Sequence, residues 1–204
     1  MDITAMLDEA HHLARIGRYD DALAQYDKVL EVDRNNTTAL EQKCEVYYYL
    51  GRHEDAIACY DQALAVNPKL MAVWYEKGYA LRKLNRFLEA IACFDQALAI
   101  DPEYTFALAN KGYALNALGR YEEAIACFDR ILESAPNTIR VITAKGIALR
   151  ELGRNKEALS CFDKALELNP INSFVWQNRA SALRNMGRTM EADESLQHVL
   201  VPPA

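Results

Sequence analysis

The sequence predicts an all-α protein in which six helix-turn-helix repeats stack along the chain. Three observations predict this fold. Related residues recur every 34 positions, apolar residues within each period follow helical spacing, and glycine, asparagine or proline punctuates the period at fixed places. A pair of helices with one apolar face each cannot bury that face alone, so neighbouring repeats are expected to stack into a shared core.

The period divides the chain into units at 3–36, 37–70, 71–104, 105–138, 139–172 and 173–204, the last of which is two residues short. Nearly identical text recurs in this register, as in residues 56–65 and 90–99. Chance does not produce such agreement. We therefore expect a single repeat domain over residues 3–204.

The first helix of each unit is marked by a small residue at the eighth position, where helices can approach closely. Those residues are Ala10, Cys44, Gly78, Gly112, Gly146 and Ala180. The helix is expected to end at a residue that tolerates the left-handed conformation, namely Gly17, Gly51, Asn85, Gly119, Gly153 and Gly187.

The second helix carries alanine at the twentieth position and a large side chain at the twenty-fourth. The large residues are Tyr26, Tyr60, Phe94, Phe128, Phe162 and Leu196. Pro68, Pro102, Pro136 and Pro170 fall near the ends of four units, where a ring without an N–H terminates the helix. The last second helix, Thr189 to Leu200, carries Asp193 and Glu194 where other units are apolar or small, and is predicted to cap the array.

Trp74, Gly78, Leu81, Ala90, Phe94 and Pro102 resemble the tetratricopeptide repeat (TPR) pattern at its fixed offsets. This resemblance covers nearly the whole chain and implies a right-handed α-α superhelix, a TPR solenoid that binds other proteins. The chain departs from the pattern at the seventh position, which holds Lys43, Lys77, Lys111, Lys145 and Arg179. These cations form either a basic stripe or ion pairs with the equally periodic Asp27, Asp61, Asp95, Asp129 and Asp163.

The resemblance also implies that the first helices line a concave groove. The predicted binding residues in it are Tyr48, Tyr75, Tyr79, Arg82, Asn110, Tyr113, Asn116, Arg140, Arg150, Gln177, Asn178 and Arg184. Tyrosine, asparagine and arginine together suit an extended or helical segment, and the basic excess predicts an acidic protein or peptide partner. Glu41, Glu45 and Glu76 predict that the groove changes sign along its length.

Composition and motifs exclude several other classes. A net charge of -6 and a pI near 5.3 disfavour nucleic-acid binding. The apolar stretches are too short to span a membrane, and the amino terminus lacks a secretory signal, so a cytoplasmic location is expected.

Four cysteines recur every 34 residues and are interpreted as small core residues beyond disulfide reach of one another. Histidine spacing and the absence of phosphate-binding or nucleophile motifs predict no metal, no cofactor and no enzymatic activity.

Two functions remain open at this stage. The leading one is an adaptor or scaffold whose groove binds a segment of another protein. The alternative is a self-associating protein that uses the terminal segment 201–204 and forms weak homo-oligomers. A clamp for chaperone tails found in part of the family is not predicted, because only Asn110 and Arg140 match its five places.

Overall fold

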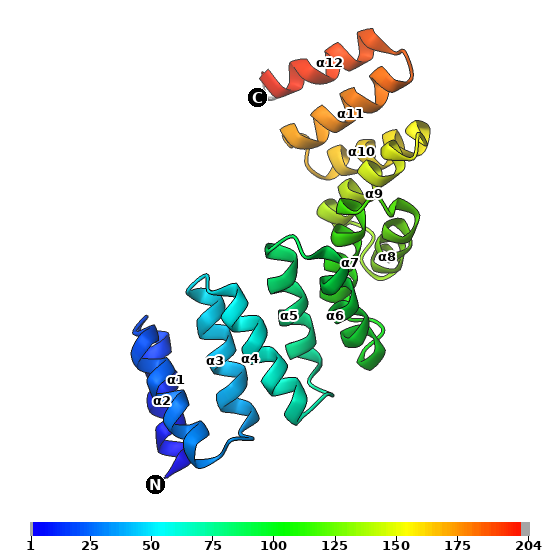
Figure 1. Ribbon diagram of the computed structural model, residues 1–204. Coiled ribbons are helices and arrows are strands. Elements are labelled where there is room, and N and C mark those ends of the chain that lie inside the picture. The colour runs from blue at the N-terminus through cyan, green and yellow to red at the C-terminus, as the bar shows by residue number, and fades with distance from the viewer. Residues whose placement is uncertain (1, 201–204) are drawn as a thin grey trace. The chain divides into compact units, whose positions relative to one another are not determined.

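The computed structural model describes residues 2–200, and every regular element in that range is an α-helix (Figure 1). The twelve helices of this range are α1 Ile3–Arg15, α2 Tyr19–Val32, α3 Thr37–Tyr49, α4 His53–Val66, α5 Met71–Lys83, α6 Phe87–Ile100, α7 Thr105–Ala117, α8 Tyr121–Ser134, α9 Ile139–Glu151, α10 Asn155–Leu168, α11 Ser173–Asn185 and α12 Thr189–Leu200. Each 34-residue unit contains one helix pair, so the predicted all-α repeat fold is confirmed.

The helices form two compact units that divide within α7, between Ala107 and Leu108. In each unit the second helix of a repeat packs on the first helix of the next, as α2 does on α3 and α10 on α11. First helices also contact one another directly, as α1 and α3 do. The apolar cores are therefore shared between repeats. The single domain over residues 3–204 stays a prediction.

The turn inside each repeat follows from one residue in the left-handed conformation. Gly17 has φ of 78°, its N–H donates to the carbonyl of Ala14, and the N–H of Arg18 donates back to the carbonyl of Leu13. This Schellman arrangement satisfies carbonyls that a helix end would otherwise leave unpaired. Asn85 takes the same role with φ of 59°, so the predicted ends of the first helices are confirmed.

Each second helix begins after an arginine that pairs with a carboxylate three residues later. Arg120 contacts Glu123 at 2.6 Å, and Arg86 contacts both Glu89 at 2.6 Å and Glu54 of the preceding repeat at 3.0 Å. The pairs also place negative charge near the positive end of the helix. Because the partners are largely exposed, each pair contributes little to stability. This periodic arginine was not predicted from the sequence.

Close packing of the two helices of a repeat explains the small residue at the eighth position. An added Cβ at Gly146 would lie 2.6 Å from Cε1 of Phe162, and one at Gly78 would lie 2.7 Å from Cε1 of Phe94. Both phenylalanines are completely buried. The predicted close approach is confirmed.

The periodic lysines pair with the periodic aspartates, and each pair joins two repeats. The contacts lie at 2.5–2.7 Å and are Lys43 with Asp27, Lys77 with Asp61, Lys145 with Asp129, and Arg179 with Asp163. The cation belongs to a first helix and the aspartate to the second helix of the preceding repeat. Of the two interpretations left open, ion pairing is the one observed at these positions.

Cys44 and Cys59 form a disulfide, with their Cα atoms 5.3 Å apart, that joins α3 to α4. The interpretation of Cys59 as an unpaired core residue is therefore wrong. The spacing argument compared only cysteines one period apart, whereas Cys44 occupies the small-residue position that faces α4 within the same repeat. Cys93 and Cys127 are buried free thiols, as expected, and Cys161 is free and half-buried.

The final helix, α12, leaves Asp193 and Glu194 exposed, which confirms the predicted water-facing surface of the terminal helix. The terminal segment 201–204, which the self-association hypothesis uses, lies outside the described residues.

Candidate functional site

In the N-terminal unit, the predicted groove positions of α3 and α5 form one polar and aromatic surface, which we call the tyrosine–glutamate face. It consists of Glu41, Glu45 and Tyr48 from α3 and Tyr75, Glu76 and Tyr79 from α5. Residues three or four apart lie on the same side of a helix, so this spacing places the side chains together. Three predicted site residues, all tyrosines, belong to this face.

The tyrosine rings of this face contact one another across the two helices. The ring centroids of Tyr48 and Tyr79 are 5.8 Å apart, and those of Tyr75 and Tyr79 are 6.1 Å apart. The guanidinium of Arg82 lies over the Tyr79 ring at 5.0 Å. A fourth predicted site residue thus joins the same surface through a cation–π contact.

Burial and neighbouring charge perturb the acids of this face. Burial, followed by the Tyr79 phenol, raises the pKa of Tyr48 to about 12. Burial raises the pKa of Glu41. Burial and then the charge of Glu41 raise the pKa of Glu45, and the charge of His11 offsets part of this rise. Burial and then the charge of Glu45 raise the pKa of Glu76. Within residues 2–200, none of these three carboxylates forms a salt bridge with a lysine or arginine.

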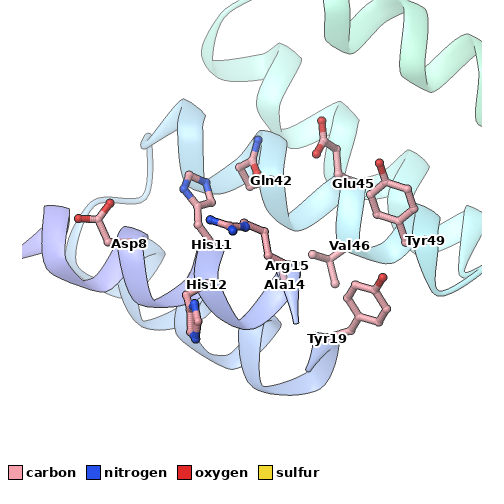
Figure 2. Close-up of a pocket in the computed structure, with 10 residues that line it drawn as sticks. All are labelled: Asp8, His11, His12, Ala14, Arg15, Tyr19, Gln42, Glu45, Val46 and Tyr49. Atoms are coloured by element: carbon pink, nitrogen blue, oxygen red, sulfur yellow. The ribbon is translucent and has the colours of Figure 1, made fainter. Parts of the chain in front are cut away.

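A pocket of about 540 Å³ opens on the same side of the N-terminal unit, between α1 and α3 (Figure 2). Figure 2 shows Asp8 at one end of its lining and the stacked rings of Tyr19 and Tyr49 at the other. Glu45 also lines it, so the pocket adjoins the tyrosine–glutamate face. None of the residues that line this pocket is among the predicted binding residues.

In the C-terminal unit, Arg150 is held in place by its neighbours. Its guanidinium donates from Nη1 to Oδ1 of Asn178 at 2.7 Å and from Nη2 to Oε1 of Glu151 at 2.5 Å. Asn178 is itself 8% exposed and donates to the carbonyl of Phe174 at 2.7 Å. Two predicted site residues, on adjacent first helices, are therefore brought together.

The remaining predicted residues of this unit fall into two groups. Asn110 is buried, Tyr113 is half-buried with its ring 5.6 Å from that of Phe128, and Asn116 donates to the carbonyl of Ala144 at 3.2 Å. Arg140, Gln177 and Arg184 are exposed, and Arg184 pairs with Asp193 of α12 at 3.2 Å. The first group holds the helices together, whereas the second is accessible to a partner.

Two exposed phenylalanines at groove positions were missed by the sequence reasoning. Phe106 is 63% exposed and lies 6.3 Å from the ring of Tyr75, and Phe174 is 56% exposed. Both occupy the second position of a repeat, where Arg140 was selected. The signal that could have found them is an aromatic residue at a position that the family resemblance assigns to the groove.

Two other kinds of site are absent from the described part of the chain. No group of three His, Cys, Asp or Glu side chains there could hold a metal ion. No helix in the same range is long and apolar enough to cross a membrane.

Sequence models of the tetratricopeptide repeat match residues 7–41, 45–105, 75–138, 140–172 and 161–194. Together these matches span most of the chain. A comparison with curated proteins gives no match.

Several solved structures share the fold. The MamA protein is 26% identical over 82% of this chain and 92% of its own, with a TM-score of 0.78. PilW, described as a type IV pilus biogenesis factor, is 25% identical over 98% of each chain, with a TM-score of 0.72. A tetratricopeptide repeat protein from Parabacteroides merdae is 19% identical over 97% of this chain and 78% of its own, with a TM-score of 0.84, which shows the fold alone.

Proposed function

Because the chain belongs to the tetratricopeptide repeat family, we propose that it binds a segment of another protein on the first helices of its repeats. The family and neighbours such as MamA and PilW support the general role of a protein-interaction scaffold. The finer proposal is that the segment is acidic and binds the C-terminal unit.

The observation that carries this proposal is the charge of the predicted groove positions on α9 and α11. They hold three arginines, Arg140, Arg150 and Arg184. Glu151 pairs with Arg150 and Asp193 of α12 pairs with Arg184, so the carboxylates are one fewer than the arginines. An acidic segment would therefore meet an excess of positive charge here. This unit favours an anionic partner even though the whole chain carries a net charge of -6.

Arg150 supplies a preorganised contact for a carboxylate. A guanidinium has five N–H donors, and the hydrogen bonds to Asn178 and Glu151 engage only some of them. Because these bonds restrict the side chain before a partner arrives, less conformational entropy is lost on binding. Arg140 is exposed on the same helix and adds a second cation.

The test uses fluorescein-labelled hexaglutamate, acetylated and amidated, as the acidic probe in fluorescence anisotropy titrations. Arg140→Glu/Arg150→Glu is expected to raise Kd at least about tenfold, the equivalent of ~1.4 kcal/mol. The matched control Lys156→Glu/Lys164→Glu reverses two exposed charges on α10, a second helix, and is expected to change Kd far less. Circular dichroism checks that both variants fold. Equal losses from the two pairs would reject the site.

Self-association stays a prediction, since no described contact favours it. Light scattering over a range of protein concentrations tests it, and a strictly monomeric protein would reject it. The cytoplasmic location and the absence of enzymatic activity also remain predictions.

A further inference from the structure

Seven aromatic side chains of the N-terminal unit form a continuous row, which we call the aromatic ladder. Successive ring centroids along the row lie 5.3–6.5 Å apart. In order, the members are Tyr19, Tyr49, Tyr48, Tyr79, Tyr75, Tyr104 and Phe106. The row extends from the start of α2, over α3 and α5, to the first turn of α7, and all of it belongs to the unit that ends at Ala107.

The ladder lies at the surface and is separate from the buried aromatic core. Tyr49 is 67% exposed and Phe106 is 63% exposed, and the other five rings are half-buried. Figure 2 shows that Tyr19 and Tyr49, at one end of the row, line the pocket between α1 and α3. Aromatic rings offer a large contact area on a rigid side chain, and an exposed row of them is typical of an interaction surface.

Six of the seven rings carry a hydroxyl, so the ladder offers apolar faces and hydrogen-bond donors side by side. A proline-rich segment needs both. In the polyproline II conformation its backbone carbonyls have no partner within the segment, and its proline rings pack on aromatic faces. A partner helix, in contrast, satisfies most of its carbonyls internally and would gain less from a row of hydroxyls.

The charges beside the ladder favour an uncharged segment. Glu45 and Asp8 line the pocket next to Tyr49, so an acidic segment would meet like charge there. The cations of Arg82 and Lys83 already lie over the Tyr79 ring, at 5.0 and 5.5 Å, so a basic segment would meet like charge at the middle of the row. Because Tyr79 is covered in this way, a partner is expected to pack chiefly on the more exposed rings towards the two ends.

We propose that the aromatic ladder binds an uncharged, proline-rich segment of a partner protein in the polyproline II conformation. This inference rests on the proposed function and specifies a second kind of ligand, in the N-terminal unit. Proline restricts the segment to its bound conformation beforehand, so little entropy is lost on binding. The two units then recognise different chemistry: uncharged and proline-rich in the N-terminal unit, acidic in the C-terminal unit.

The test titrates fluorescein-labelled decaproline, amidated, with the full chain at neutral pH and follows fluorescence anisotropy. Phe106→Ala is expected to raise Kd at least about fivefold, and Tyr49→Ala/Phe106→Ala at least about tenfold. The matched control is Phe174→Ala, which removes an exposed phenylalanine from the same position of a later repeat, outside the ladder. It is expected to change Kd less than about twofold. Circular dichroism checks that each variant folds.

Several results would overturn the inference. They are no binding of decaproline, equal losses from Phe106→Ala and Phe174→Ala, and equal affinity for a labelled Gly-Ser repeat of the same length. Hexaarginine that binds more tightly than decaproline and is weakened by Tyr49→Ala/Phe106→Ala would assign the ladder to a basic segment instead. Self-association in light scattering that this double variant abolishes would assign it to a second copy of the chain.

The same double variant separates this inference from the proposed acidic partner. Hexaglutamate binding is expected to survive in Tyr49→Ala/Phe106→Ala, because Arg140 and Arg150 belong to the other unit. If hexaglutamate binds and decaproline does not, the proposed function stands and this inference fails. If decaproline binds and hexaglutamate does not, the acidic partner is rejected and the ladder stands as the binding surface.

Discussion

Replacement of Gly146 by alanine tests whether packing or helix propensity dominates at the eighth position. Alanine is favoured over glycine inside a helix by about 1 kcal/mol, so propensity alone predicts a more stable protein. The added Cβ would, however, lie 2.6 Å from Cε1 and 3.0 Å from Cδ1 of Phe162, and 3.1 Å from Cβ of Cys161. Because Phe162 is fully buried and cannot swing into solvent, overpacking should cost about 1–3 kcal/mol. Once the propensity gain of about 1 kcal/mol is subtracted, we expect a net loss of up to about 2 kcal/mol.

The free energy of unfolding is measured by urea denaturation monitored by circular dichroism, and variants are compared where their m-values are equal. Phe162→Leu in the same chain should recover part of the loss, because it removes the atoms that the Cβ would meet. Gly153→Ala is the control. Nothing lies within 4 Å of a Cβ added there, but the φ of Gly153 is 75°, so alanine should lose stability through backbone strain alone. Phe162→Leu should not reduce that loss of stability. If Gly146→Ala were more stable than the parent by the full ~1 kcal/mol that helix propensity predicts, the packing argument would be refuted.

Three other outcomes follow from the structure. Burial raises the pKa of Glu76 above its unfolded value, so its contribution to stability is complete at low pH and is lost as pH rises through the folded pKa. Glu76→Gln should therefore raise Tm at pH 7, and this gain should shrink towards pH 4. A gain in Tm that does not depend on pH would contradict this. Thiol titration of the unfolded, unreduced chain should find three thiols, with two more released from Cys44 and Cys59 by reductant, whereas five before reduction would exclude the disulfide. Asp61→Asn, which removes the largely exposed partner of Lys77, should cost less than about 1 kcal/mol in denaturation, and a much larger loss would show that the pair is more than a surface contact.

The fold could be predicted closely because its determinants are local and repeated. Gly17 and Asn85 mark the ends of first helices through their own backbone conformations, which need no knowledge of distant contacts. The small residues that face Phe94 and Phe162 could also be predicted, because the same close packing of two helices recurs in each repeat. Periodicity also indicated the lysine–aspartate pairs as one of two alternatives, because both partners recur at fixed places.

The site was less predictable because its chemistry depends on contacts between repeats. Arg150 could be selected as a cation, but its orientation depends on a hydrogen bond to Asn178, which lies on a different helix, α11. Cys44 was grouped by position with glycine and alanine, and that grouping concealed its proximity to Cys59. Nor does the sequence reveal that the hydroxyls of Tyr26 and Tyr60 have no hydrogen-bond partner among residues 2–200, since phenylalanine holds the same packing position in later repeats.

The ion pairs between successive repeats have a consequence for how such a chain can change length. Lys77 contacts Asp61, and Lys43 contacts Asp27, through equivalent positions one period apart. Excision of residues 37–70 would leave Lys77 opposite Asp27, so the new junction would reproduce an old one. Excision of a length that is not a multiple of 34 residues would break this correspondence. The chain can thus gain or lose whole 34-residue repeats while the ion pairs between neighbouring repeats stay equivalent.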